Sequence, residues 1–311
     1  KIVDLFCGCG GLSKGLGDAG FDVVWACDNW EKAVEVYRDN FDHPVEQKDL
    51  SDPSDLIGKI EGFEVSGIVG GPPCQDFSSA GKREEGGRAD LTGSFSEIIQ
   101  RVSPHFFIME NVPRARLSNA YASARANFKS AGYGLTEVVL DASLCGVPQK
   151  RKRFFCIGIK NAEDGALSDI IENKLSDEPM SVRNYLANEI DFEFYYRHPR
   201  NYSRRAIYSV DEPAATVRGV NRPVPAGYPG HKNDAVALDS SIRSLTTFER
   251  ARIQTFPPKF KWEAAKTHLE LMIGNAVPVE LAKFVGECVF EGLKSADAAS
   301  GQRAEEECET C

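Results

Sequence analysis

The chain has 311 residues, of which 42% are hydrophobic and 27% charged, so it can bury a large core in one big domain or one domain with a smaller lobe. No apolar run approaches the roughly 18 residues that a membrane span requires. The nine cysteines lack the spacing of a zinc site or a disulfide framework, so we expect a cytoplasmic protein with reduced thiols, no metal and no membrane contact. The net charge of -9 does not favour nucleic acid as a partner, although a local basic face would.

The first 160 residues alternate short apolar segments with segments of helical periodicity. Strands are predicted at 1–6, 22–27, 67–70, 105–110, 135–140 and 153–159. Helices are predicted at 11–19, 31–40, 94–102 and 119–130. This alternation indicates an α/β fold, a mostly parallel sheet with helices on both faces, in which ligands bind at the carboxyl ends of the strands. The segments DLFCGCGG, CDNW, GGPPCQ and MENVP all fall at such strand ends.

The composition of the chain changes after residue 173. Residues 174–240 are rich in Arg, Tyr, Pro and Asn, which predicts a small lobe of short strands and loops. Helical periodicity returns at 247–255 and 278–294, so we expect 241–294 to rejoin 1–173 in one domain. The small, polar and acidic tail, 295–311, is predicted to be disordered.

Glycines follow the first predicted strand, where they allow a tight turn and close approach of a ligand to the backbone. The dinucleotide fingerprint G-x-G-x-x-G fails, because Ser13 occupies the position of the third glycine. Asp28 ends the second strand and can accept hydrogen bonds from ribose hydroxyls, or cap the following helix. Asp49 can bind an adenine amine, or form a turn. These residues favour a cofactor that carries a nucleoside but is not a dinucleotide.

A lone cysteine, Cys74, follows two glycines and two prolines in GGPPCQDFS. The prolines stiffen the loop and the glycines let it leave the sheet sharply, which presents the thiol as a nucleophile; a buried turn cysteine is the alternative. Glu110 ends the next predicted strand and is expected beside this loop, where shielding from water makes a carboxyl a proton donor. Arg151 and Arg153 can bind a carbonyl oxygen or a phosphate, or form a basic surface turn.

Six segments occur in the order DLFCGCGG, GGPPCQDFS, MENVP, QKRKR, RSLTTFERARIQTFP and IGNAVP. From residue 1 to about residue 293 the chain thereby resembles the cytosine-C5 methyltransferases that act on DNA, of the bacterial restriction-modification type. The resemblance implies a Rossmann-like S-adenosyl-L-methionine-dependent methyltransferase fold, with a catalytic domain at 1–173 and 241–294. It also implies a mainly β and loop target-recognition domain at 174–240, double-stranded DNA as the partner, and functional pairing with a cognate restriction endonuclease. We expect a monomer.

The resemblance assigns roles to individual residues. Cys74 would attack C6 of a flipped-out cytosine, and Glu110 would engage N3 and the exocyclic amine. Arg151 and Arg153 would support the loop and bind O2. The residues implied to bind the cofactor, with Phe6 stacked on the adenine, are Phe6, Gly8, Gly10, Gly11, Asp28, Asn29, Asp49, Leu50, Pro72, Asn275 and Val277. The residues implied to bind DNA are Gln75, Ser78, Arg197, Arg200, Arg204, Arg205 and Arg218.

Two positions depart from the family pattern. Ser94 stands where a leucine is common, and Cys145 replaces a tyrosine, which we expect to be a packing variant rather than a second nucleophile.

Three other functions are alternatives to DNA cytosine methylation. A tRNA cytosine-C5 methyltransferase would share the thiol mechanism, but the Cys-Phe-Thr signature usual in such proteins is absent. A nicotinamide-dependent oxidoreductase would rest on the glycine loop alone and has no use for Cys74. A catalytically silent DNA-binding module would not need the motif residues.

Overall fold

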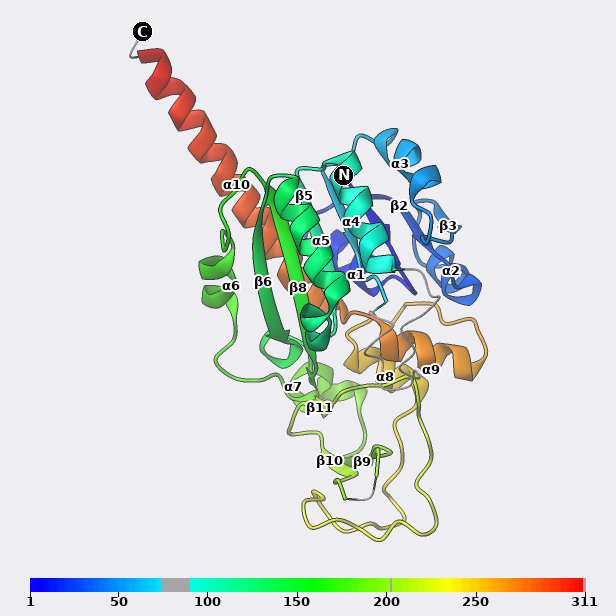
Figure 1. Cartoon of the computed structure of the whole chain (residues 1–311). Coiled ribbons are helices and arrows are strands. Elements are labelled where there is room, and N and C mark those ends of the chain that lie inside the picture. The colour runs from blue at the N-terminus through cyan, green and yellow to red at the C-terminus, as the bar shows by residue number, and fades with distance from the viewer. Residues whose placement is uncertain (74–89, 202, 310–311) are drawn as a thin grey trace.

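The computed structural model describes residues 1–73, 90–201 and 203–309 and has two lobes of unequal size (Figure 1). Seven strands of the described chain form one sheet in the order β3-β2-β1-β4-β5-β8-β6. They are β1 (Ile2–Leu5), β2 (Val23–Asp28), β3 (Val45–Gln47), β4 (Gly67–Gly70), β5 (Phe106–Asn111), β6 (Tyr133–Asp141) and β8 (Lys152–Lys160). Only β8 runs antiparallel to its two neighbours in this sheet. The predicted mostly parallel α/β sheet is confirmed.

Helices cover both faces of the sheet (Figure 1). On one face lie α1 (Gly11–Asp18), α6 (Ser168–Lys174) and α10 (Val279–Glu309). On the other lie α3 (Ser54–Glu61), α4 (Leu91–Val102) and α5 (Asn119–Ser130), while α2 (Glu31–Arg38) packs beside β2 and β3. Successive residues of β5 serve opposite faces, because side chains of a strand alternate: Phe106 joins the α1 and α10 cluster, and Phe107 joins the α4 and α5 cluster.

The smaller lobe is held by its own apolar cluster and by a strand pair that reaches the larger lobe. Its antiparallel strands β9 (Phe194–Tyr196) and β10 (Ile207–Ser209) lie against long connections, with Ile242 in the same cluster. The short strand β11 (Ala214–Ala215) pairs with β7 (Gln149–Lys150), which directly precedes β8. The other short elements are η1 (Pro113–Leu117), η2 (Ala142–Leu144), α7 (Val182–Leu186), η3 (Ala187–Glu189), α8 (Thr247–Ile253) and α9 (Lys266–Asn275).

The last helix extends into the tail. Residues 295–311 are predicted to be disordered, whereas α10 continues through Glu309. The composition of this tail explains the difference, because its alanines and glutamates are good helix formers even though they offer little apolar surface. The helix predicted at 278–294 thus continues beyond its predicted end, and the disorder of the tail stays a prediction.

The acid inside the first strand, Asp4, is completely buried. The Ser13 hydroxyl donates a hydrogen bond of 2.5 Å to Asp4 Oδ2, and the Tyr37 hydroxyl donates one of 2.7 Å to Ser13 Oγ. Asp4 Oδ1 has no hydrogen-bond partner among the described residues. Burial raises the pKa of Asp4 to about 7; the nearby Asp28 adds to the rise and the bond from Ser13 opposes it. The strand therefore holds a carboxyl that the folded protein prefers to keep protonated.

This burial makes the stability of the fold depend on pH through Asp4. The Asp4 carboxyl binds its proton more tightly in the folded protein than in the unfolded chain. The stability that this proton contributes is therefore fully present below pH 4 and is lost as the pH rises to about 7. Asp4→Asn keeps an acceptor for Ser13 and should remove this dependence on pH. The free energy of unfolding of the variant minus that of wild type should therefore be larger at pH 8 than at pH 4, by up to about 4 kcal/mol. Urea unfolding of both proteins at the two pH values measures the difference, and a constant difference would contradict the prediction.

Candidate active site

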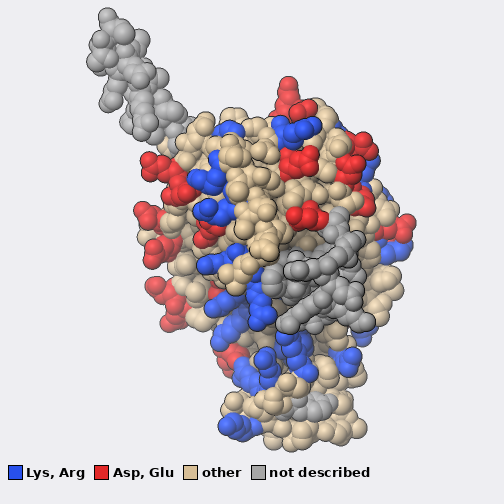
Figure 2. All heavy atoms as spheres, viewed as in Figure 1, with Lys and Arg blue, Asp and Glu red and all other residues tan. Residues whose placement is uncertain are grey.

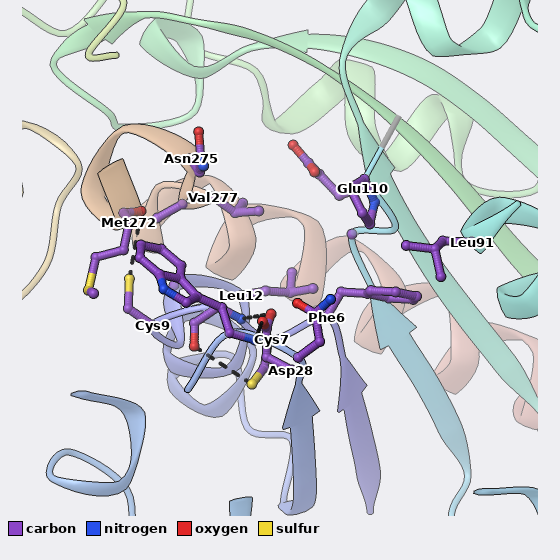
Figure 3. A pocket seen from close by; sticks show the side chains of 17 residues that line it. Phe6, Cys7, Cys9, Leu12, Asp28, Leu91, Glu110, Met272, Asn275 and Val277 are labelled. Atoms are coloured by element: carbon purple, nitrogen blue, oxygen red, sulfur yellow. Dashed lines mark hydrogen bonds between the residues drawn. The ribbon is translucent and has the colours of Figure 1, made fainter. Parts of the chain in front are cut away.

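A cavity of about 290 Å³ opens at the carboxyl ends of β1, β2, β4 and β5, the edge where parallel sheets bind ligands (Figure 3). Its walls come from the chain segments that follow these strands and from the junction of α9 and α10. The predicted residues that line it are Phe6, Gly8, Gly11, Asp28, Asn29, Glu110, Asn275 and Val277. Residues separated by more than 260 positions in the sequence thus share one site.

The turn after β1 contains backbone φ angles that glycine adopts more easily than other residues. Phe6, Gly8 and Gly10 all have positive φ angles, of 62°, 54° and 94°. A Cβ on Gly10 would lie 2.3 Å from the ring of Phe41, so any side chain there would collide. Gly8 instead faces open space, and its N–H donates to Asp28 Oδ2 at 2.8 Å. The positive φ of Phe6, unusual outside glycine, is held where the chain turns into the cavity, as strain at functional sites often is.

Asp28 joins the turn after β1 to the start of α2. Its Oδ2 accepts from Gly8, and its Oδ1 accepts from the Trp30 N–H at 2.8 Å. Burial raises the pKa of the Asp28 carboxyl, and these backbone hydrogen bonds oppose the rise. Asp28 does not cap α2, because the N-cap of that helix is Trp30 and has no side-chain hydrogen bond. Each carboxylate oxygen keeps a lone pair for a ligand hydroxyl in the cavity.

Glu110 lies at the end of β5, and its side chain is 12% exposed. Arg153 Nε lies 2.8 Å from Glu110 Oε1. Burial raises the pKa of Glu110, while the charges of Arg153 and Arg151 oppose the rise. A Cβ on Gly71 would lie 3.2 Å from Glu110 Oε2, so the chain leaving β4 passes directly beside this carboxyl. The carboxyl is buried, partly paired and open to the cavity.

The segment that leads to Cys74 is fixed to the strand that carries Glu110. The Asn111 side chain donates a hydrogen bond of 2.9 Å to the carbonyl of Pro72, and Pro73 lines the cavity. The predicted nucleophile and the predicted DNA contacts Gln75 and Ser78 lie outside the described residues. The described part of the site therefore ends at the residue before Cys74.

Arg151 is placed differently from Arg153. Its side chain is 1% exposed and donates to the carbonyls of Val217 and Gly274 at 2.9 Å and of Ala276 at 3.0 Å. Neither Arg151 nor Arg153 is among the described residues that line the cavity, although Arg153 pairs with Glu110, which does. Arg151 therefore holds together the cavity wall after α9 and the entry to the smaller lobe, and its guanidinium contacts backbone, not the cavity.

Four of the residues predicted to bind the cofactor do not line the cavity: Gly10, Asp49, Leu50 and Pro72. Asp49 accepts a hydrogen bond from the Ser51 N–H at 2.9 Å, which is the turn that the sequence offered as its alternative. Leu50 is a core residue. The lining residues that the sequence analysis missed are Cys7, Cys9, Leu12, Trp30, Gly71, Pro73, Leu91, Met272 and Ala276. Of these, Trp30 had a signal, because it follows Asp28 in the unusual segment CDNW.

The two positions that depart from the family pattern are both buried and serve packing. The Ser94 hydroxyl donates to the Asp90 carbonyl at 3.3 Å within α4, and it does not line the cavity. Cys145 is 5% exposed, and its thiol donates to the Asp141 carbonyl at 3.6 Å. Burial raises the pKa of Cys145 to about 12, so its thiol is a poor nucleophile.

A second hollow, of about 500 Å³, lies in the smaller lobe and gathers five of the predicted DNA-binding residues. Its arginines are Arg197, Arg200, Arg204, Arg205 and Arg218. Lys150 from the larger lobe also lines it, and no described Asp or Glu does. Figure 2 shows lysines and arginines gathered where the two lobes meet, while many acidic side chains lie on the outer faces of the larger lobe. The acidic protein thus has a basic face, and the hollow lined by these five arginines and Lys150 is called the basic groove.

The described residues offer neither a metal site nor a membrane span. No group of three or more His, Cys, Asp or Glu side chains there could hold a metal ion. No helix in the described part of the chain is both long and apolar enough to cross a membrane. The cysteines at positions 7, 9, 27, 145, 156 and 288 are buried free thiols.

The sheet, with its single antiparallel strand and a ligand cavity at its carboxyl edge, is the fold of an α/β methyltransferase. The solved structure of the S. pombe Dnmt2 methyltransferase matches it with a TM-score of 0.70 at 19% identity, over 94% of this chain and 98% of that one. The family of C-5 cytosine-specific DNA methylases matches residues 1–291, and the chain belongs to this family. It is a DNA (cytosine-5-)-methyltransferase, as the motifs predicted.

Two relatives are similar over nearly their whole length. Type II methyltransferase M.HindV of Haemophilus influenzae is 53% identical over 292 residues, which cover 93% of this chain and 96% of the relative. Type II methyltransferase M.HgiDI of Herpetosiphon aurantiacus is 51% identical over 286 residues, which cover 92% of each. The oxidoreductase and the silent binding module are not supported by any of these matches.

Proposed function

We propose that the protein transfers a methyl group from S-adenosyl-L-methionine to C5 of a cytosine flipped out of a short specific site in duplex DNA, through a covalent bond between Cys74 and C6. We further infer that it is the modification enzyme of a Type II restriction-modification pair, acts as a monomer, and is matched by an endonuclease of the same specificity. The two Type II relatives support the assignment to a restriction-modification pair. The family match to DNA methylases favours DNA over tRNA.

The observation that carries the proposal is the position of Glu110 beside the chain that leads to Cys74. Gly71, Pro73 and Glu110 line one cavity, and Cys74 directly follows Pro73. Burial raises the pKa of Glu110, which favours a protonated carboxyl. A thiol one position after Pro73 in the sequence and a proton donor at the cavity would supply the two groups that activation of a pyrimidine ring requires.

The proposed chemistry overcomes the poor nucleophilicity of C5. The Cys74 thiolate adds to C6 while Glu110 gives a proton to N3, so the ring electrons move to C5 as an enamine. C5 would then take the methyl group, whose bond to the cofactor sulfur would break and leave its electron pair on that sulfur. A base removes the proton from C5, the bond between C6 and sulfur breaks to release the thiolate, and N3 returns its proton to Glu110. Arg153, paired with Glu110, would bind O2 of the same ring.

The cavity has the chemistry that the cofactor, which supplies the methyl group, would need. Phe6, Leu91 and Val277 offer apolar surfaces for an adenine, as seen around the cavity in Figure 3. Asp28 offers carboxylate oxygens for ribose hydroxyls. A Cβ on Gly8 would meet no described residue within 4 Å, so the described chain leaves this backbone open to a ligand. We propose Phe6, Gly8, Asp28 and Asn275 as its principal contacts.

The covalent step predicts a trapped complex. Bisulfite sequencing of DNA from cells that express the protein first identifies the modified site. A duplex with 5-fluorocytosine at that position should then form a stable adduct with the enzyme and cofactor, because fluorine cannot leave C5 as a proton does. Cys74→Ala should form none. Denaturing electrophoresis measures the adduct.

The matched control is Cys145→Ala, which removes a buried thiol outside the cavity and should leave adduct formation intact. An adduct with Cys74→Ala, or 4-methylated rather than 5-methylated cytosine in the product, would refute the proposal. Transfer of labelled methyl groups to tRNA but not to duplex DNA would favour the alternative substrate.

A further inference from the structure

The arginines of the basic groove are held in different ways. Arg197 Nη2 donates a hydrogen bond of 2.7 Å to the carbonyl of Thr216, and Arg218 Nη2 donates to the carbonyl of His198. Both bonds join the segment 197–198 to the segment 216–218, one in each direction. Each segment therefore holds a guanidinium of the other in place. Neither guanidinium has an ion pair with a described carboxylate. Burial lowers the pKa of both, to about 10 for Arg218.

Two other arginines of the groove provide contrasts. Arg205 is ion-paired with Glu212, and its guanidinium lies 4.1 Å from the centroid of the Tyr208 ring. Arg204 is exposed, and no hydrogen bond or ion pair joins its guanidinium to another described residue. With respect to the described residues, the groove therefore contains two fixed cations without a counter-charge, Arg197 and Arg218, one neutralised cation, Arg205, and one cation whose guanidinium is not held, Arg204.

Fixed and free cations suit different parts of a duplex. Reading a guanine takes two N–H donors aimed at O6 and N7 at once, a geometry that a guanidinium reaches at lower entropic cost when it is already held in place. The carbonyl of His198 takes one of the five donors of Arg218, so others remain for a base. A phosphate accepts a cation from many directions, which a mobile side chain satisfies.

We propose that Arg218, with Arg197 fixed beside it, reads a guanine in the target site, whereas Arg204 binds backbone phosphates. The inference rests on the proposed function, since it takes duplex DNA as the ligand of the basic groove. It assigns specificity and affinity to different residues of one surface.

The test compares discrimination with affinity. Methylation kcat/KM is measured on duplexes with the wild-type site, identified by bisulfite sequencing, and with each single base-pair substitution. Arg218→Lys keeps the charge but loses the fork, so discrimination at one G·C pair should fall by roughly 10- to 100-fold, with the other positions unchanged. Arg204→Ala should weaken binding to all duplexes alike and make the slope of log Kobs against log salt less negative by about 0.9.

Arg183→Lys is the matched control, because this guanidinium on α7 pairs with Glu193 and Asp211 and does not line the basic groove, so discrimination should stay as in wild type. The inference is overturned if Arg218→Lys discriminates between duplexes as well as wild type does. It is also overturned if Arg204→Ala loses discrimination at a single base pair. If Arg218→Lys does not fold, as judged by circular dichroism, Arg197→Lys is measured by the same ratios, and discrimination equal to wild type overturns the inference. A wild-type protein that methylates none of the duplexes would instead contradict the proposed function.

Discussion

Replacing Glu110 with glutamine should lower the single-turnover rate of cytosine methylation by roughly 10²- to 10⁴-fold, the usual contribution of a general acid. Glutamine has the same size and can still form hydrogen bonds, but it has no carboxyl proton to give to N3. Glu110 and Arg153 are 12% and 14% exposed, so the surrounding residues should hold the substituted side chain in place. Rapid-quench measurements with labelled methyl groups give the rate, and filter binding checks that duplex affinity is retained.

The same substitution should change the pH dependence of the rate. A proton donor must be protonated, so the active fraction of wild type falls as the pH rises through the pKa of Glu110, which burial raises. Ionisation of the nucleophilic thiol works in the opposite direction, so the wild-type profile should be bell-shaped. Glu110→Gln should lose the alkaline decline. Equal rates, or the same decline in both proteins, would remove Glu110 from the mechanism.

A matched control for this variant is Glu137→Gln. Glu137 lies on β6, outside the cavity, and its Oε2 is 2.9 Å from Arg125 Nε. The control thus neutralises a carboxylate paired to arginine without touching the site, and its methylation rate should match wild type. A rate loss as large as that of Glu110→Gln would attribute the effect to the fold and not to proton donation.

The fold could be predicted where the sequence carries a strong local period. The strands and helices predicted before residue 160 lie within three residues of those observed. The missed elements include β3, α3, α6, α7 and α9, and two of them illustrate the physical reasons. In β3 only three residues pair, of which one is buried, so no alternation can be seen. In α9 the buried residues include Glu270 and Gly274, so the helix has no clean apolar stripe.

The site could be predicted where its residues belong to one segment and not where distant segments meet. Phe6, Gly8 and Asp28 stand at strand ends, which the sequence reveals. Arg151 and Arg153 look equivalent in the sequence, yet one contacts backbone carbonyls and the other Glu110. The carbonyls that Arg151 binds, from Val217 and Gly274, are 66 and 123 positions away, so no local pattern could assign them.

Arg250→Met should lower the free energy of unfolding by about 3–5 kcal/mol, the cost of leaving one member of a buried ion pair without its partner. Arg250 on α8 pairs with Glu270 on α9, and both side chains are 5% exposed. Glu270 Oε1 also accepts from Thr247 at 2.8 Å and from Asn221 at 3.1 Å. Arg250 Nη2 donates to the carbonyl of Arg218, which links this pair to the basic groove.

The double variant Arg250→Met/Glu270→Leu separates the unpaired charge from the lost packing. Removing both charges leaves no buried carboxylate, so the double variant should be at least ~2 kcal/mol more stable than Arg250→Met alone. Urea unfolding of the two single variants and the double variant measures this coupling, and additive losses would show that the pair does not act as a unit. Because Arg250 also holds the carbonyl of Arg218, Arg250→Met should weaken base discrimination as well. A folded Arg250→Met protein with wild-type discrimination would show that Arg218 keeps its position without this link.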